Sequence, residues 1–126
     1  MSGETPSPRR EDRPDGSVRI WFATPILFHA DPKAYVDLRP PTAGDVWDLG
    51  DPRGFLFNDA GLGTPYVDRS LLRQWIPRLM VDHDADIVSR ERDAALGILI
   101  EEAVLDFFAK ARTRLKPASA PSPVPA

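Results

Sequence analysis

The densest group of side chains that could hold a metal ion is the acidic run at residues 82–86, Asp-His-Asp-Ala-Asp. Carboxylates at alternate positions open the calcium loop of an EF-hand, which also needs glycine at its sixth position and glutamate at its twelfth. Counted from the first aspartate, those two positions hold Ile87 and Asp93. The run therefore departs from a calcium loop. An acidic loop between two helices, with Asp86 or Ser89 capping the second, is the simpler interpretation.

His83 in the same run is the candidate general base, because the chain has only two histidines. The other, His29, is expected at the far end of an N-terminal hairpin, and no serine with an acidic partner accompanies either of them. A metal-dependent hydrolase built on residues 82–86 is the enzymatic alternative. It predicts that a chelator lowers the thermal stability of the protein.

Glu101, Glu102 and Asp106 could form a pair of carboxylates at helical spacing, as glycosidases and di-metal proteins use. A solvated helix face accounts for the same three residues without any chemistry. The chain has no cysteine, which removes thiol nucleophiles, disulfides and thiolate zinc sites. We therefore predict a protein that is not an enzyme and that holds no metal ion or cofactor.

A phosphate-binding loop is the chemical interpretation of the glycine-rich residues 50–64. Such a loop ends in Gly-Lys-Ser/Thr before a helix, whereas Gly63 is followed here by Thr64 and Pro65. The stretch is instead predicted to be an irregular loop. Thr64 is then expected to cap a helix that starts at Pro65 and runs to about Trp75.

Charge and hydropathy exclude two classes of partner. With 16 basic and 19 acidic side chains, the chain lacks the basic excess of a nucleic-acid-binding domain. Its longest apolar stretch is residues 95–100, far short of the roughly 20 residues that cross a bilayer. The first residues are polar and no apolar segment of a secretory signal follows them, so a cytoplasmic location is expected.

The elements that must position these residues occupy the middle of the chain, because half of the 14 prolines lie in its two ends. Residues 1–17 and 116–126 carry few large apolar side chains, so burial would not offset the backbone entropy lost on ordering. Both ends are predicted to be disordered tails. Residues 18–115 are left as one domain, long enough to fold alone around a small core.

An α+β fold is predicted for this domain, with a small β-hairpin, a short helix and two longer C-terminal helices. β-Branched and aromatic residues over 18–28 indicate one bent strand or two short ones, and residues 35–39 alternate as a returning strand. Thr42 is a natural N-cap with Asp45 three residues later, so the short helix is expected over residues 43–49.

The clearest element is the last helix, predicted from a cap at Ser89 to about Leu115. Ile98 and Leu105 lie together on one side of this helix. Either the preceding helix covers this narrow stripe or the stripe meets another chain, because apolar stripes outside a small domain tend to be interaction surfaces. The opposite, buried face is predicted to hold Leu96, Leu99, Ile100, Ala103, Val104, Phe107 and Ala111, with Phe108 at its edge.

The order of these elements and two short motifs resemble a known family. Residues 38–45 read Leu-Arg-Pro-Pro-Thr-Ala-Gly-Asp after the hairpin, and the last helix carries paired phenylalanines at 107 and 108. Together they resemble the tail assembly chaperones of Mu-like and related tailed phages, in which a β-segment leads to a Leu-Arg-x-Pro-Thr-x-x-Asp-like stretch. The resemblance covers residues 18–115, but the aromatic sequence Phe-Leu-Phe at 55–57 has no place in it.

The resemblance implies a non-enzymatic protein of the host cell cytoplasm. Such a chaperone binds the long helical tape measure protein and keeps it soluble during tail tube assembly, with the tail tube protein as a second expected partner. The residues expected to contact the partner are Ile98, Leu105 and Phe108. Those expected to fix the turn between sheet and helix, or otherwise to serve the fold, are Arg39, Pro41, Thr42, Asp45 and Phe107.

The alternative function is that of a minor structural component of a phage tail or baseplate. Such a component would use the same exposed surfaces for permanent contacts. The two functions differ in one observable, because a structural component stays in the finished particle whereas a chaperone of this family leaves it.

Overall fold

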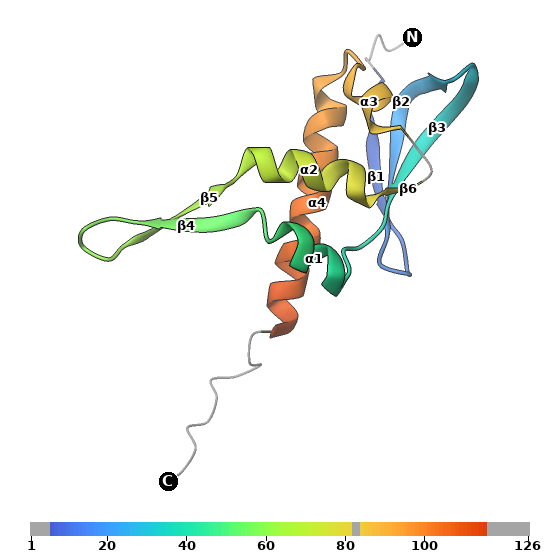
Figure 1. The fold of residues 1–126 in the computed structure, drawn as a ribbon. Coiled ribbons are helices and arrows are strands. Elements are labelled where there is room, and N and C mark those ends of the chain that lie inside the picture. Colours follow the sequence, from blue (N-terminus) through green and yellow to red (C-terminus); the bar gives the residue numbers. More distant parts are fainter. Residues whose placement is uncertain (1–5, 82–83, 116–126) are drawn as a thin grey trace.

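A computed structural model of the protein describes residues 6–81 and 84–115. The fold is mixed α+β, as the sequence predicts: a sheet lies on one side of a long helix, and a second hairpin extends away from both (Figure 1). In chain order the elements are β1 (Arg9–Asp12), β2 (Val18–Phe28), β3 (Asp31–Leu38), α1 (Ala43–Leu49), β4 (Arg53–Phe57), β5 (Gly63–Val67), α2 (Arg69–Leu79), β6 (Met80–Val81), α3 (Ala85–Ser89) and α4 (Ala94–Leu115).

The β2–β3 hairpin forms the centre of a four-stranded antiparallel sheet with the order β1-β2-β3-β6. β2 is a single strand whose pairing with β3 shifts register between Trp21 and Ile26, where Thr24-Pro25 interrupts the ladder. The chain reverses at His29 and Ala30, both with positive φ. The predicted hairpin is confirmed.

The prediction that residues 1–17 form a disordered tail is wrong for β1. This strand pairs antiparallel with β2, from Arg9 opposite Trp21 to Asp12 opposite Val18. Its side chains add contacts: the Trp21 indole N–H donates to Glu11 at 2.9 Å, and the Arg9 guanidinium lies 4.9 Å from the centroid of the Trp21 ring. These partners are distant in sequence, so local composition did not reveal them. The predicted tail at 116–126 lies outside the described residues.

The core lies between the sheet, α2 and α4. Trp75 on α2 is fully buried, meets the Phe108 ring edge-on at a centroid distance of 4.9 Å, and donates its indole N–H to the Gly50 carbonyl at 2.7 Å. Isoleucine, valine and leucine from alternate positions of β2 and β3 complete the interior. Within the described residues, no helix has the length and apolar character needed to cross a membrane.

The last helix ends at Leu115 as predicted but begins five residues after Ser89, at Ala94. Ser89 is the last residue of the separate short helix α3, and its hydroxyl donates to the Asp86 carbonyl at 2.7 Å. Asp93 instead accepts the backbone N–H of Ala95 at 3.1 Å. The predicted cap at Ser89 is therefore wrong, because α3 ends at Ser89 and α4 begins only after Asp93, whose side chain accepts a free N–H group of the first turn.

The predictions of an irregular loop over residues 50–64 and of a helix beginning at Pro65 are wrong. β4 and β5 form a two-stranded antiparallel hairpin here, and Thr64 and Pro65 lie in β5. The turn is organised by Asn58, whose side-chain oxygen accepts the N–H groups of Ala60 and Leu62. α2 starts only at Arg69, after Asp68 caps it by accepting the Leu71 N–H at 3.0 Å.

Candidate partner-binding surface

The acidic run at 82–86 has only part of its length in the described residues. Asp82 and His83 lie outside them. Asp84 caps α3 by accepting the Asp86 N–H at 2.9 Å, which is the structural role expected of an acidic loop. Among the described residues no group of three or more histidine or acidic side chains is placed to hold a metal ion.

The carboxylates of α4 do not form a catalytic pair. Glu101 accepts from Arg69 of α2 at 2.5 Å, and Asp106 accepts from Arg10 of β1 at 2.5 Å. Each carboxylate thus pairs with an arginine of a different element, and Glu102 is exposed. These ion pairs join α2 and β1 to the long helix.

The motif at residues 38–45 builds a compact polar junction between β3 and α1. The Asp45 carboxylate is buried and accepts two hydrogen bonds from Arg39, at 2.6 and 3.2 Å, and one from Nε of Arg78 at 2.9 Å. It also accepts the Thr42 N–H at 2.9 Å, while the Thr42 hydroxyl accepts the Asp45 N–H, so the two residues form a capping box. Pro41 is half-buried beside them.

This junction keeps Asp45 charged. Hydrogen bonds from Arg39, from the Thr42 N–H and from Arg78 hold the pKa of Asp45 well below the ordinary value of an aspartate. Every acceptor position of the carboxylate faces a partner within the chain, so nothing is left for a substrate. Arg39, Thr42 and Asp45 therefore fix the turn between sheet and helix.

The three residues predicted as the partner contact do not form one surface. Phe108 is only 5% exposed and packs on Trp75, and its neighbour Phe107 is buried as well. Leu105 is half-buried against the core. Ile98 alone is exposed, at 56%. The contact surface expected from sequence is therefore wrong for Phe108, because α2 crosses α4 at that position and brings Trp75 onto the ring.

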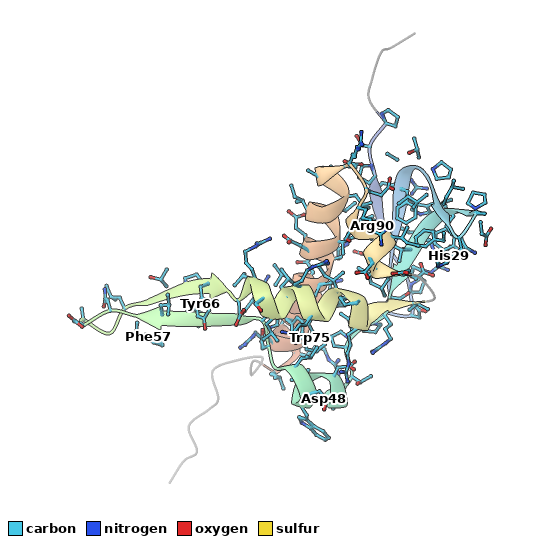
Figure 2. The ribbon with its side chains drawn as sticks, turned by 45° about the horizontal axis from the view of Figure 1, so that its top comes forward. His29, Asp48, Phe57, Tyr66, Trp75 and Arg90 are labelled. Carbon is cyan, nitrogen blue, oxygen red and sulfur yellow. The ribbon has the colours of Figure 1, made fainter. Side chains whose placement is uncertain are left out.

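The largest group of exposed apolar side chains lies on the β4–β5 hairpin instead. Figure 2 shows this hairpin extending from the body with Phe57 and Tyr66 along it. Its tip is closed by a backbone hydrogen bond from the Asn58 N–H to the Leu62 carbonyl. The exposed apolar side chains of the hairpin are Phe55, Leu56, Phe57, Leu62 and Tyr66. We call this set the hairpin patch.

Two glycines let the aromatic rings of the hairpin patch lie flat on the strands. A Cβ at Gly54 would come within 2.7 Å of the Tyr66 ring, and a Cβ at Gly63 within 2.9 Å of the Phe57 ring. Each glycine thus provides the space that the ring opposite it in the hairpin occupies. The rings are held in place by the hairpin but remain open to solvent on their outer sides.

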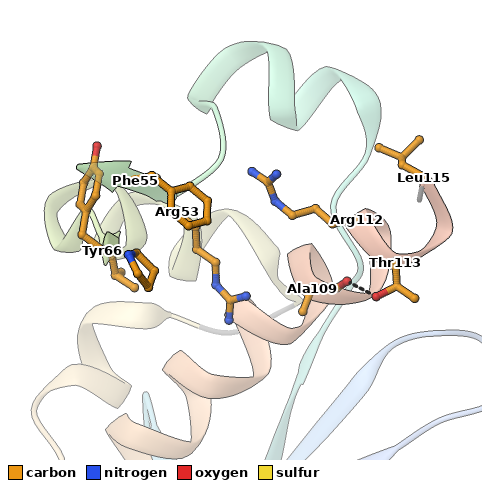
Figure 3. Close-up of a pocket in the computed structure, with 10 residues that line it drawn as sticks. Arg53, Phe55, Tyr66, Ala109, Arg112, Thr113 and Leu115 are labelled. Carbon is orange, nitrogen blue, oxygen red and sulfur yellow. Dashed lines mark hydrogen bonds between the residues drawn. The ribbon is translucent and has the colours of Figure 1, made fainter. Parts of the chain in front are cut away.

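A groove of about 950 Å³ runs between one face of the hairpin and the end of α4. Figure 3 shows its two walls, with Arg53, Phe55 and Tyr66 on the hairpin side and the last two turns of α4 opposite. The α4 wall consists of Ala109, Arg112, Thr113 and Leu115. Arg112 is paired with Asp51.

Comparisons with family models, curated proteins and solved structures gave no significant match. The functional argument for this chain therefore rests on its own residues and geometry and on the motif resemblance at residues 38–45.

Sequence reasoning missed the hairpin patch, although a signal was present. Apolar residues at 55–57 and at 62–67 flank an Asn-Asp-Ala-Gly stretch, which is the spacing of two strands joined by a short turn. The signal was obscured by Thr64-Pro65, which also fits the start of a helix. The remaining exposed large apolar side chains lie on other elements and in smaller groups: Val46 and Trp47 on α1, Leu27 on β2, and Ile98 and Leu115 on α4.

Proposed function

We propose that this protein is a phage or prophage tail assembly chaperone that binds the tape measure protein in the host cytoplasm. It keeps that long helical chain soluble while tail tube subunits assemble, and it does so without enzymatic chemistry. The observation that carries the proposal is the hairpin patch, which exposes five large apolar side chains on an element that contributes little to the core.

The physical reason is that an isolated two-stranded hairpin is marginally stable in water and gains nothing from exposing phenylalanine. An exposed apolar surface of this kind is expected in a protein whose partner covers the surface while the two are bound. A tape measure protein is a suitable partner because a long, partly apolar helical chain aggregates when it is left uncovered. Transient cover by a small acidic domain would keep it in solution.

The resemblance at residues 38–45 supports the same proposal. The arginine, threonine and aspartate of that stretch, Arg39, Thr42 and Asp45, bind one another in a single junction. Because the three side chains bind one another, they form one structural unit and not three separate matches of common residue types.

The test starts from the DNA on either side of the reading frame. An upstream tail tube gene and a downstream frame for a very long helical protein would supply the partner. Co-expression of this chain is then expected to move the tape measure protein from the insoluble to the soluble fraction. A tape measure protein that stays insoluble, or neighbouring genes unrelated to tails, would contradict the proposal.

Purified particles separate the chaperone from the alternative of a retained tail or baseplate component. We expect mass spectrometry of finished particles to detect the tube and tape measure proteins but not this chain. A stoichiometric amount of the chain in the particle would favour the structural component instead.

A further inference from the structure

The groove between the hairpin patch and α4 has one apolar wall with no cover from the described residues. Phe55 and Tyr66 are 59% and 42% exposed, and Leu115 on the opposite wall is 82% exposed. The described residues therefore do not fill the space between the walls that Figure 3 draws.

The charges of the groove indicate what kind of molecule this is. Arg53 lines the hairpin wall, and none of the described carboxylates lies within ion-pair distance of its guanidinium. Arg112 lines the other wall and is neutralised by Asp51. Among the described residues, the groove thus presents one positive charge without an ion-pair partner beside apolar side chains, which is complementary to an apolar surface flanked by carboxylates.

The position of the groove favours a helix over an extended segment. Its walls are side chains of the hairpin and of α4, whereas the unpaired backbone groups of the two-stranded hairpin lie along its two outer edges. An extended segment lying there would bury its own N–H and C=O groups without partners. An α-helix satisfies these groups internally and presents only side chains.

The size of the groove agrees with this occupant. An α-helix of about 10 Å diameter fills a volume of this kind with roughly 12 Å of its length, or about two turns. Two turns present three or four residues of one face, enough for an apolar stripe with an acidic residue at its border.

We infer that the groove binds an amphipathic helix of the tape measure protein, with the apolar face against Phe55, Pro65 and Leu115 and a carboxylate toward Arg53. This inference rests on the proposed function for the identity of the partner. The residues of the groove define the binding mode, which is helix packing in an apolar groove.

The test compares two exposed apolar residues on different hairpins. Phe55 lines the groove and Leu27 of β2 does not, and the two side chains are 59% and 64% exposed. Full-length Phe55→Ser and Leu27→Ser are co-expressed with the tape measure protein from the neighbouring gene. We expect Phe55→Ser to retain at least tenfold less soluble tape measure protein than wild type, and Leu27→Ser to retain most of it.

A charge reversal supplies an independent readout. Arg53→Glu is expected to reduce the amount of soluble tape measure protein at least fivefold. The control is Arg92→Glu at an exposed arginine between α3 and α4, which changes the net charge equally and is expected to leave the amount of soluble tape measure protein unchanged. Circular dichroism of each purified variant checks that the chain is folded, so a loss of binding in a folded variant is attributable to the groove.

The outcomes separate the two proposals. A wild-type chain that leaves the tape measure protein insoluble contradicts the proposed function and with it the partner named here. If the wild-type chain solubilises the tape measure protein and the Phe55→Ser and Arg53→Glu variants do so equally well, the result contradicts the assignment of the groove as the binding site and leaves the proposed function standing. Sedimentation of the purified chain tests a second copy as the occupant: a dimer that Phe55→Ser converts to a monomer would overturn the assignment to a partner helix.

Discussion

The two hairpins of this protein have the same topology and opposite surroundings. In β2–β3 the inward side chains Ile20, Val36 and Leu38 are completely buried under α4, and the outward side carries a polar and aromatic layer. In that layer Arg19 pairs with Asp37 and lies over the Tyr35 ring. Apart from Leu27 near the turn, which is 64% exposed, the large apolar side chains of this hairpin are covered from within the chain.

In β4–β5 neither face is covered in the same way. Phe55 and Phe57 lie on one face and Leu56 on the other, and all three are exposed. The difference between the hairpins separates two uses of apolar side chains: those of β2–β3 stabilise the fold, and those of β4–β5 are available to a partner. Substitutions in the two hairpins should therefore affect different properties.

The largest expected effect is on Ile20 of β2. Ile20→Ala should lower the free energy of unfolding by about 3 kcal/mol, because it removes a fully buried side chain and leaves a cavity. Leu56→Ala in the other hairpin should change it by less than about 0.5 kcal/mol. Urea denaturation followed by tryptophan fluorescence measures both, and equal losses would abolish the distinction between the hairpins.

The junction that joins the first hairpin to α1 should rank next. Asp45→Asn is expected to cost about 2 kcal/mol, because Arg39 and Arg78 lose the carboxylate that they share. The control is Asp59→Asn, which makes the same chemical change at an exposed position of the second hairpin. A loss below about 0.5 kcal/mol in urea denaturation would show that the junction is dispensable to the fold.

The same carboxylate should make stability depend on pH. Its pKa is lowered in the folded protein, so its contribution is fully present above the unfolded value of about 3.9 and is lost as pH falls toward the folded value. We expect the difference in urea midpoint between wild type and Asp45→Asn to shrink as pH falls from about 5 to about 2. A difference that stays constant over this range would contradict a charged Asp45 in the native state.

The smallest effect on stability is expected at Phe57, the most exposed aromatic residue of the hairpin patch, at 70%. Phe57→Ser should change the free energy of unfolding by less than about 0.5 kcal/mol, because little of the ring is removed from water on folding. Thermal denaturation provides the measurement, with Phe28→Ser in the buried β2 as the matched substitution. A loss at Phe57 comparable to that at Phe28 would place the hairpin in the core of the free protein.

The parts of the fold that were predictable from sequence are those with local and periodic signals. The β2–β3 hairpin follows from alternation, α1 from the Thr42 cap with Asp45, and most of the buried face of α4 from helical spacing, although Ala111 of that predicted face is exposed. β1 was not predictable, because the contacts that order it come from Trp21 and Asp106, distant in sequence. The helix expected at Pro65 failed because Thr64-Pro65 fits both a helix start and a strand at a sheet edge.

The candidate site was predictable only in part, for a related reason. Helical periodicity places Ile98 and Phe108 on particular sides of α4, but it does not determine which other element lies there. The structure covers Phe108 with Trp75 and leaves Ile98 exposed. Exposure of an apolar side chain depends on neighbours from the whole chain, so the hairpin patch became visible only once the elements were packed.

By itself the sequence determined the α+β class, the capped turn at Thr42–Asp45 and the amphipathic character of the last helix, because each depends on residues within a few positions of one another. Only the tertiary structure decided that Arg78 joins Arg39 on Asp45, that α2 crosses α4 at Phe108, and that β4–β5 extends beyond the core. Those features follow from the burial of large apolar side chains around Trp75, to which residues from most of the domain contribute at once.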